Sequence, residues 1–384
     1  MEIKIIASTK PGYVAKKEEF DDFSGKVAGV CYMTNDFDSL LNEPKEKTDK
    51  RVQSTMSGKH HSVFEHDYVT LNLQGVPKLF AMVLNNEKTY VTSEKSARYT
   101  KMVCTEEEQK LYDKWYEIFI KKIRQRYPDD QGFMTDLRVK KLAQENARYI
   151  ISVMTPTTMI YTTSYRQLNY LCNWMQDELN NVNSKYFMLF DYFEKFISFA
   201  KSNNLLDERL MNDGKFRKLS LINQGKQRNE IFDDVYSTNY QASFAYLAQA
   251  QRHRTLNYEI NDINVGEFFV PKILLSDNSL VDEWKTDLYR VKNNLPQGTL
   301  VNINERGTYE NFVLKLKERL CSCAQLEIDN KTRELLLKYY NATTNEDIKN
   351  DIKARLMGSR CTFKDFTCET PCGFADGIKG ERDI

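Results

Sequence analysis

The feature that most constrains the fold is an order of segments that occurs twice along the chain. In the first part, an alternating apolar segment at 68–74 and an apolar run at 79–84 precede a polar loop and then helical periodicity. In the second part, the apolar run 243–248 precedes an extended segment at 267–275 and again helical periodicity. Alternation is typical of half-buried strands, and short apolar runs between turn residues indicate buried strands. The sequence therefore predicts an α+β protein of two related halves, each a small mixed or antiparallel sheet flanked by long helices.

Helical periodicity and turn residues divide the rest of the chain. Apolar residues recur at helical spacing at 105–127, 139–151, 164–179, 185–200, 279–291, 305–340 and 344–356. The polar segment 205–228 contains Gly214 and Gly225, which indicates a linker. The predicted parts are a first half at 1–204, the linker 205–228, a second half at 229–342, and a C-terminal helix with a cysteine-bearing tail at 343–384. Identity between the halves is low, and we interpret them as a diverged tandem duplication.

Composition excludes several classes of protein. The 384 residues allow two or three domains, and 55 basic against 54 acidic residues leave no global charge that would attract nucleic acid or a membrane. The longest apolar stretches fall far short of a membrane span, and the segment Met1–Ile6 is too short and too charged for a signal peptide. The eight cysteines, several of them isolated, favour a reduced cytoplasmic protein over a disulfide scaffold. Any anion-binding site is therefore expected to be local.

A short basic segment follows the apolar run 243–248 and holds Arg252, His253 and Arg254. If that run is a strand, the two arginines point to one face of the extended chain and the histidine to the other. Paired guanidinium groups are good phosphate receptors, because each donates paired charge-assisted hydrogen bonds. Taken alone, the triplet is better explained as a solvated basic turn, so other motifs have to decide.

The first half contains four further motifs. They are His60-x-Ser62-x-x-Glu65-His66, Glu94-x-Ser96-x-Arg98-Tyr99, a helical Arg148, and Thr163-Ser164-Tyr165-Arg166 at the start of the next helix. The loop from Glu94 to Tyr99 offers a hydroxyl, a guanidinium and backbone amides, a combination that suits a phosphate dianion. Arg148 also has a plain structural explanation, because Glu145 lies one helical turn before it and could form a surface ion pair with it.

The second half carries a different set. It consists of Gln249-x-x-Arg252-His253-Arg254, Leu295-Pro296, and Arg319 five residues before Ala324-Gln325-x-Glu327-Ile328. Taken in order over the segment 55–330, the motifs of both halves together resemble the signature of the flavin-dependent thymidylate synthases. Each element of that signature is present once, in one half or the other. The chain departs from the family in its length, since the family is usually a single shorter domain.

The two halves have lost complementary motifs. The first half has Asn86-Glu87-Lys88 where the basic triplet belongs, and it lacks the final arginine. The second half lacks the Ser-x-Arg-Tyr loop and has Lys292 in place of the helical arginine. Active sites of the family are built from several subunits of a tetramer. The resemblance thus implies a composite site to which each half contributes one part, in a homodimer that imitates the tetramer.

The resemblance also implies a role for each motif residue. The FAD cradle would consist of Arg252, His253 and Arg254 together with His60, Ser62, Glu65 and Arg166. The dUMP site would consist of Glu94, Ser96, Arg98, Tyr99, Arg148, Gln249 and Arg319. Gln249 and Arg319 would be the catalytic pair that faces the uracil. An arginine there would stabilise the negative charge that develops on the carbonyl oxygen as hydride arrives.

The implied activity is the conversion of dUMP to dTMP, with FAD as cofactor, methylenetetrahydrofolate as one-carbon donor and NADPH as reductant. Two alternatives stay open at this point. The chain could be a diverged flavoenzyme that modifies a pyrimidine nucleotide differently, for example by hydroxymethylation. It could also be a non-catalytic nucleotide-binding homologue.

The cysteines near the C-terminus have two interpretations. Cys361, Cys368 and Cys372, with Cys321 or Cys323, could assemble a structural zinc site. Their spacing is irregular and the tail is short, which favours reduced thiols without a ligand. The sequence therefore predicts no metal.

Overall fold

The structure is a computed structural model in which the chain forms two compact units. It describes residues 1–9, 17–32, 37–96, 98, 100, 102–128, 134–211, 220–223, 227–356, 358–369, 372 and 382–384. Unit 1 contains Met1–Lys95 and Pro156–Ser220, and unit 2 contains Ser96–Thr155 and Leu221–Ile384. The segment 96–155, which lies in the first part of the sequence, therefore folds together with the second part.

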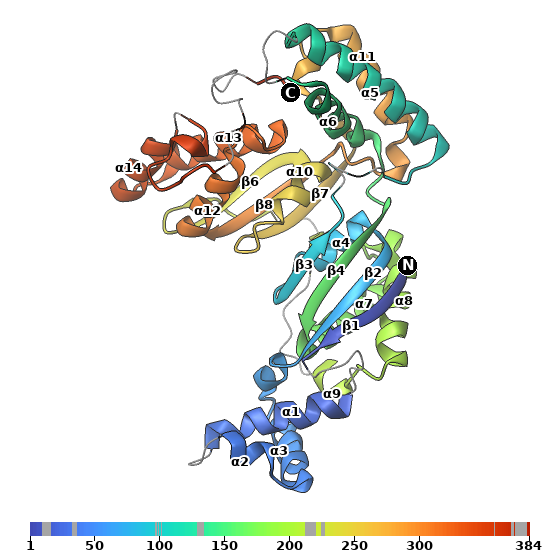
Figure 1. Ribbon diagram of the computed structural model, residues 1–384, viewed down its shortest axis with the longest axis vertical. Helices are drawn as coiled ribbons and strands as arrows, with labels where there is room; N and C mark the ends of the chain where they lie inside the picture. Colours follow the sequence, from blue (N-terminus) through green and yellow to red (C-terminus); the bar gives the residue numbers. More distant parts are fainter. Residues whose placement is uncertain are drawn as a thin grey trace. The chain divides into compact units, whose positions relative to one another are not determined.

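A four-stranded antiparallel sheet forms the centre of unit 1 (Figure 1). Its strands are β1 (Glu2–Ser8), β2 (Tyr68–Pro77), β4 (Pro156–Ser164) and β3 (Tyr90–Glu94), in that spatial order. The strand predicted at 68–74 is confirmed as β2, and its alternation buries Val69, Leu71 and Leu73. The helices of this unit are α1 (Lys17–Gly29), α2 (Phe37–Leu41), α3 (Lys45–Ser57), α4 (Lys78–Leu84), α7 (Tyr165–Asn180), α8 (Phe190–Ser202), α9 (Glu208–Met211), and the short 3-10 helices η1 (Val30–Tyr32), η2 (His61–Glu65) and η5 (Phe187–Leu189).

Unit 2 contains a second antiparallel sheet with the corresponding strand order (Figure 1). Its strands are β5 (Ile231–Phe232), β6 (Val235–Ser243), β8 (Thr299–Thr308) and β7 (Asn257–Phe268). Its helices are α5 (Glu106–Arg126), α6 (Asp136–Ala147), α10 (Phe244–Ala250), α11 (Asn278–Arg290), α12 (Tyr309–Arg319), α13 (Leu326–Ala342), α14 (Glu346–Arg355), and the 3-10 helices η4 (Arg148–Ile150), η6 (Lys272–Leu274), η7 (Lys292–Asn294) and η8 (Arg360–Thr362). The α+β architecture with two antiparallel sheets flanked by helices is therefore confirmed.

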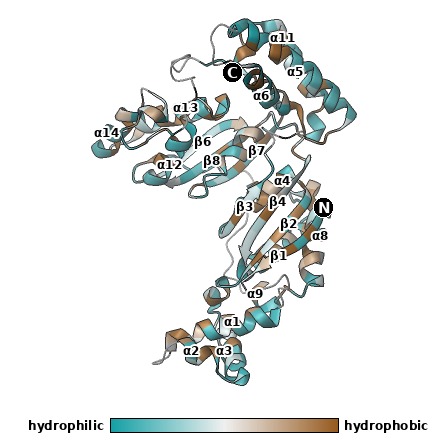
Figure 2. Cartoon of the chain, in the orientation of Figure 1, coloured by the Kyte–Doolittle hydropathy of each residue, from teal (hydrophilic) through white to brown (hydrophobic). Residues whose placement is uncertain are grey.

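The segment 96–155 is held in unit 2 by an aromatic core. Thr105 begins α5 with the expected capping box, because its side chain accepts from the backbone of Glu108 while the Glu108 side chain accepts from Thr105. The buried face of α5 then presents Trp115, whose ring meets that of Trp284 on α11 edge-on at 4.8 Å. The indole of Trp115 also donates to Asp287 at 2.9 Å. Figure 2 shows hydrophilic and hydrophobic residues alternating along α5, as expected of a helix with one buried face.

Two apolar runs predicted as strands are helices. The run 79–84 lies in α4, in which every residue is buried, and the run 243–248 belongs to α10, which is capped by the Ser243 hydroxyl accepting from the Tyr246 amide. Periodicity cannot separate a strand from a short helix that is buried on all sides. For α10 the Ser243 cap was a signal of a helix, whereas α4 begins after Pro77 without a side-chain cap.

Other boundaries were also misplaced. The extended segment expected at 267–275 is wrong, since β7 ends at Phe268 and is followed by η6. The long helical region expected from 305 is β8, α12 and α13, with a turn between the two helices. Among the described residues, no helix combines the length and apolar character needed to cross a membrane.

Candidate functional site

The basic triplet forms a turn directly after α10. Backbone hydrogen bonds from Arg252 to Gln249 (3.2 Å) and from His253 to Ala250 (2.9 Å) wind the chain, so the expected extended backbone is wrong. The opposite placement of the side chains nevertheless holds. Arg252 and Arg254 are exposed, whereas His253 is only 8% exposed. The two arginines therefore face solvent, and the histidine faces the protein.

His253 binds Arg319, which ends α12. Nε of Arg319 donates to Nε2 of His253 at 2.7 Å, and its Nη2 donates to the backbone oxygen of Gln249 at 3.0 Å. Burial, followed by the positive charges of Arg319 and Lys315, lowers the pKa of His253 to about 2. The imidazole is therefore neutral, with Nε2 as acceptor and its proton on Nδ1. It fixes the direction of the guanidinium without a charge of its own.

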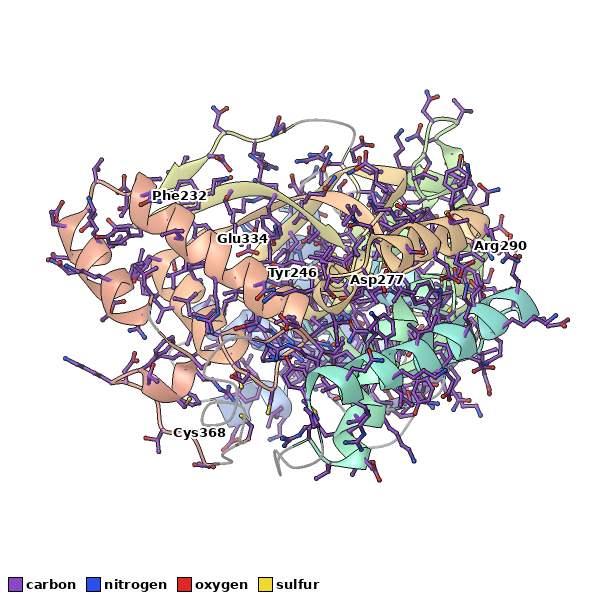
Figure 3. All side chains as sticks on the ribbon, turned by 90° about the horizontal axis from the view of Figure 1, so that it is seen from above. Phe232, Tyr246, Asp277, Arg290, Glu334 and Cys368 are labelled. Carbon is purple, nitrogen blue, oxygen red and sulfur yellow. The ribbon has the colours of Figure 1, made fainter. Side chains whose placement is uncertain are left out.

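A buried ionic network lies one helical turn before Arg319. Nζ of Lys315 donates to the two carboxylate oxygens of Glu305 at 2.9 and 2.6 Å, and both side chains are fully buried. The Lys315 ammonium also donates to the hydroxyl of Tyr246 at 3.2 Å, and the Tyr240 hydroxyl donates to Glu305 at 2.5 Å. Tyr246 is labelled in Figure 3, in the interior of this unit. The network anchors α12 to β8 and α10, and thereby supports the position of Arg319.

Arg98 joins the same region from the loop before α5. Its Nε donates to Glu145 at 2.5 Å, and its Nη2 donates to the backbone oxygen of Cys323 at 3.1 Å. The loop is closed by the amide of Arg98 donating to the hydroxyl of Ser96 at 3.3 Å. The charge of Arg98 acts on both Arg148 and Arg319. We call Arg98, Arg148 and Arg319 the arginine cluster.

Arg148 is buried, at 5% exposure, and its Nη2 donates to Oε1 of Gln325. The surface ion pair considered for Arg148 and Glu145 is therefore wrong, because Glu145 accepts from Arg98 instead. Burial lowers the pKa of Arg148, but a guanidinium keeps its proton at neutral pH. A buried charge of this kind persists only where hydrogen bonds or an anion compensate for lost hydration.

Gln325 connects the segment 96–155 to the second half of the sequence. Its Oε1 accepts from both Arg148 and Gln249, and its Nε2 donates to the hydroxyl of Tyr149. That hydroxyl donates in turn to Glu327 at 2.8 Å, and Glu327 also accepts from the amide and hydroxyl of Ser243. Burial raises the pKa of Glu327. We did not predict Gln325, Glu327 or Tyr149 as site residues, although the first two belong to the motif quoted at 324–328.

Two polar atoms of this site lack a hydrogen-bond partner in the described structure. They are Nε of Arg148 and Oε1 of Gln249, and both are buried. A buried polar atom without a partner costs ~1–3 kcal/mol, so such atoms usually mark a place for water or a ligand. Arg148 also lines a cavity of about 20 Å³ with Thr100 and Gln144, which has room for water but not for a nucleotide. Oε1 of Gln249 can therefore accept, and Nε of Arg148 can donate, a hydrogen bond to a polar molecule at this site.

Five of the remaining predicted site residues lie in unit 1. Glu65 accepts from Arg166 at 2.9 Å, and Arg166 also stacks on Tyr170. His60 precedes η2, and Ser62 lies within it. Glu94 pairs with Lys78, and both side chains are buried. Tyr99 falls outside the described residues. The structure therefore brings Arg98, Arg148, Gln249, His253 and Arg319 together in unit 2, and His60, Ser62, Glu65, Glu94 and Arg166 belong to unit 1.

The fold and the site together define an α+β protein that carries the half-buried arginine cluster in unit 2. Residues 14–182 match the family model of Thy1, described as thymidylate synthase complementing protein, which confirms the family resemblance over that segment. The match includes Arg98 and Arg148 and ends before the residues of α10 and α12. No curated protein sequence matches the chain.

Several solved structures are similar to the chain over about half of its length. The UMP/dUMP methylase PolB from Streptomyces cacaoi, bound with 5-Br dUMP, has a TM-score of 0.33 at 16% identity, over 55% of this chain and 93% of that one. Thymidylate synthase X (ThyX) from Helicobacter pylori, with FAD and dUMP, has a TM-score of 0.31 at 15% identity, over 56% of this chain and 98% of that one. At such TM-scores these likenesses say nothing about the activity of this chain.

Proposed function

We propose that the chain is a flavin-dependent thymidylate synthase that converts dUMP to dTMP. One observation carries the proposal: within unit 2, Arg98 and Arg148 from the segment that matches the family lie with Gln249, His253 and Arg319 from the second half. The mutual loss of motifs supports the same conclusion. Each half retains the part that the other lacks, as expected of a diverged duplication that kept one composite site.

The arginine cluster would bind the nucleotide. Arg98, with the hydroxyl of Ser96, suits the phosphate dianion, because a guanidinium donates paired hydrogen bonds to phosphate oxygens. Arg148, whose cavity has room only for water, would contact the nucleotide through a bridging water at its Nε, and Gln249 would contact it through its buried Oε1. Arg319 would face the carbonyl oxygen of the uracil, where its charge stabilises the developing oxyanion. Because His253 is neutral and accepts a hydrogen bond from Arg319, the guanidinium of Arg319 keeps one orientation.

The residues also fit a flavin. FAD, when bound, supplies the hydride for this chemistry, with NADPH as reductant and methylenetetrahydrofolate as one-carbon donor. The exposed Arg252 and Arg254 on one turn suit its diphosphate. We keep His60, Ser62, Glu65 and Arg166 as flavin contacts on the family resemblance. Arg166 already has a carboxylate partner in Glu65, so we assign it the role of orienting Glu65. The assembly would be a homodimer with two related halves in each chain.

The test uses the purified full chain. We expect a flavin absorbance spectrum that NADPH bleaches under anaerobic conditions, and mass-spectrometric detection of dTMP from dUMP and methylenetetrahydrofolate. A hydroxymethylated nucleotide would instead identify the alternative enzyme, and the absence of both flavin and nucleotide binding would refute the proposal.

Three arginine variants then test the composite site. Arg98→Gln should weaken dUMP binding, and Arg252→Gln should weaken FAD binding, each at least ~10-fold, because a charge-assisted hydrogen bond contributes ~1.5–3 kcal/mol. Arg290→Gln is the matched control, since Arg290 is an exposed arginine of the same unit that pairs with Glu107. If Arg98→Gln or Arg252→Gln keeps full binding and turnover, the two halves do not share one site.

A further inference from the structure

The segment 382–384 is bound in the interior of unit 2. Arg382 is 3% exposed and Ile384 is 2% exposed. The Ile384 side chain belongs to the aromatic core that holds the segment 96–155 in this unit. Figure 1 marks the C-terminus beside α6. Segments without helix or strand usually run over the surface, so the contacts that bury this one need an explanation.

Asp383 joins this segment to the end of α5 and to η6. Its carboxylate accepts a hydrogen bond from Nε of Arg126 at 2.6 Å and pairs with Nζ of Lys272 at 3.0 Å. Its amide donates to the hydroxyl of Tyr127 at 3.0 Å. Arg126 ends α5, and Tyr127 is the C-cap of that helix. Asp383 is therefore anchored to the segment 96–155, which supplies Arg98 and Arg148 to the candidate site.

Arg382 joins the same segment to the turn between α12 and α13. Its Nη1 donates to the backbone oxygen of Ala324 at 3.0 Å. Its Nε and Nη2 donate to the backbone oxygen of Ile384 at 3.0 and 2.8 Å. Ala324 is 7% exposed, and a buried carbonyl oxygen needs a donor because leaving it unpaired costs free energy. The guanidinium supplies this donor from 58 positions along the chain and fixes the place of Ala324.

Ala324 directly precedes Gln325, on which the arginine cluster depends. Gln325 is the N-cap of α13 but makes no side-chain capping bond. Its amide is committed instead to Arg148, Gln249 and Tyr149. No capping bond therefore fixes the direction in which this side chain leaves the helix. The backbone just before the helix has to fix it, and Arg382 holds that backbone.

We propose that Arg382 and Asp383 are positioning residues of the nucleotide site. Asp383 holds the end of α5, and Arg382 holds the turn that leads into Gln325, so together they join the two parts of the sequence that form the site. Both act through Gln325 and Arg148 and not by touching dUMP. The effect on dUMP rests on the proposed function, whereas the joining of the two parts is measurable without any ligand.

A positioning role differs from a general contribution to stability. Arg126 is 50% exposed and Lys272 is 47% exposed, and ion pairs with such exposed partners contribute little to overall stability. Loss of the Asp383 charge should therefore loosen the junction without unfolding unit 2. A displacement of ~1 Å at a binding group can cost ~100-fold in rate, so a small shift of Gln325 is sufficient to weaken the site.

Hydrogen exchange of the full chain without ligand measures the junction directly. In Asp383→Asn and Arg382→Met, the backbone amides of 145–151 and 320–329 should exchange at least ~5-fold faster than in the wild type, and those of β6 should not change. Asp282→Asn is the matched control, since Asp282 is an exposed aspartate of α11 in the same unit, and it should exchange as the wild type. Asp383→Asn keeps the test valid if the variant of the buried arginine fails to fold. Unchanged exchange in both variants, or faster exchange throughout unit 2, would overturn the proposal.

Binding measurements then separate positioning from general loosening. Asp383→Asn should raise the dissociation constant for dUMP at least ~5-fold and leave that for FAD within ~2-fold of wild type, because the bonds of Asp383 lead to α5 and η6, which the proposed flavin site does not include. Asp383→Glu keeps the carboxylate and should recover most of the affinity for dUMP. A wild type that binds no dUMP contradicts the proposed function, and hydrogen exchange then decides this inference. Equal affinity for dUMP in the wild type and Asp383→Asn contradicts the inference itself.

Discussion

His253 should make the stability of unit 2 sensitive to mild acid. Its pKa is about 2 in the folded chain against 6.5 for an ordinary histidine, because burial and two neighbouring cations exclude the proton. Since the folded pKa is depressed, the contribution of His253 to stability is complete above pH 6.5 and is lost as the pH falls toward 2. From pH 6.5 to pH 5 the loss is ~2 kcal/mol, at ~1.36 kcal/mol per pH unit.

Urea unfolding of the wild type and of His253→Gln at pH 7 and pH 5 measures this effect. Glutamine can still accept a hydrogen bond from Arg319 but does not titrate. Between pH 7 and pH 5 the free energy of unfolding of the variant should therefore fall by ~2 kcal/mol less than that of the wild type. Subtracting the change in the free energy of unfolding of the variant from that of the wild type cancels the contributions of all other titrating groups. His66→Gln is the control, because His66 is exposed in unit 1, and it should behave as the wild type. Equal losses for His253→Gln and wild type would show that His253 is not held neutral, and the position assigned to Arg319 would be wrong.

Three further substitutions probe the site and the stability of unit 2. Gln325→Leu should lower the free energy of unfolding by ~2–5 kcal/mol and weaken dUMP binding, because three buried polar groups lose their partner, whereas the exposed control Gln241→Leu should stay within ~0.5 kcal/mol of wild type. Lys315→Met should cost ~3–5 kcal/mol in urea unfolding by stranding the buried carboxylate of Glu305, and adding Glu305→Gln should recover part of this loss. Burial would raise the pKa of Glu259 on β7, but hydrogen bonds from Arg228 and Arg306 outweigh this effect and lower the pKa to about 2. Its contribution is therefore present above pH ~4.5 and lost toward pH 2, and Glu259→Gln should flatten acid unfolding in that window.

The apolar alternation of Val69, Leu71 and Leu73 was sufficient to locate a central strand, because a side chain in a strand faces the core at every second residue. The capping box at Thr105 likewise located the start of α5, since it acts within one turn of the chain. The runs at 79–84 and 243–248 were assigned wrongly because both lie in helices that are almost entirely buried. A segment that is apolar throughout carries no period from which its conformation can be deduced.

For the site, the sequence by itself determined which residue types were available and in which order. Motif order led to the prediction of Arg98, Arg148, Gln249 and Arg319 as site residues, because those side chains have a recognisable spacing along the chain. It did not show that Arg148 is buried against Gln325, or that His253 is a neutral acceptor for Arg319. Those facts depend on contacts between residues 66 to 177 positions apart. Burial and electrostatic fields at such separations exist only once the chain has folded, and tertiary structure alone decided them.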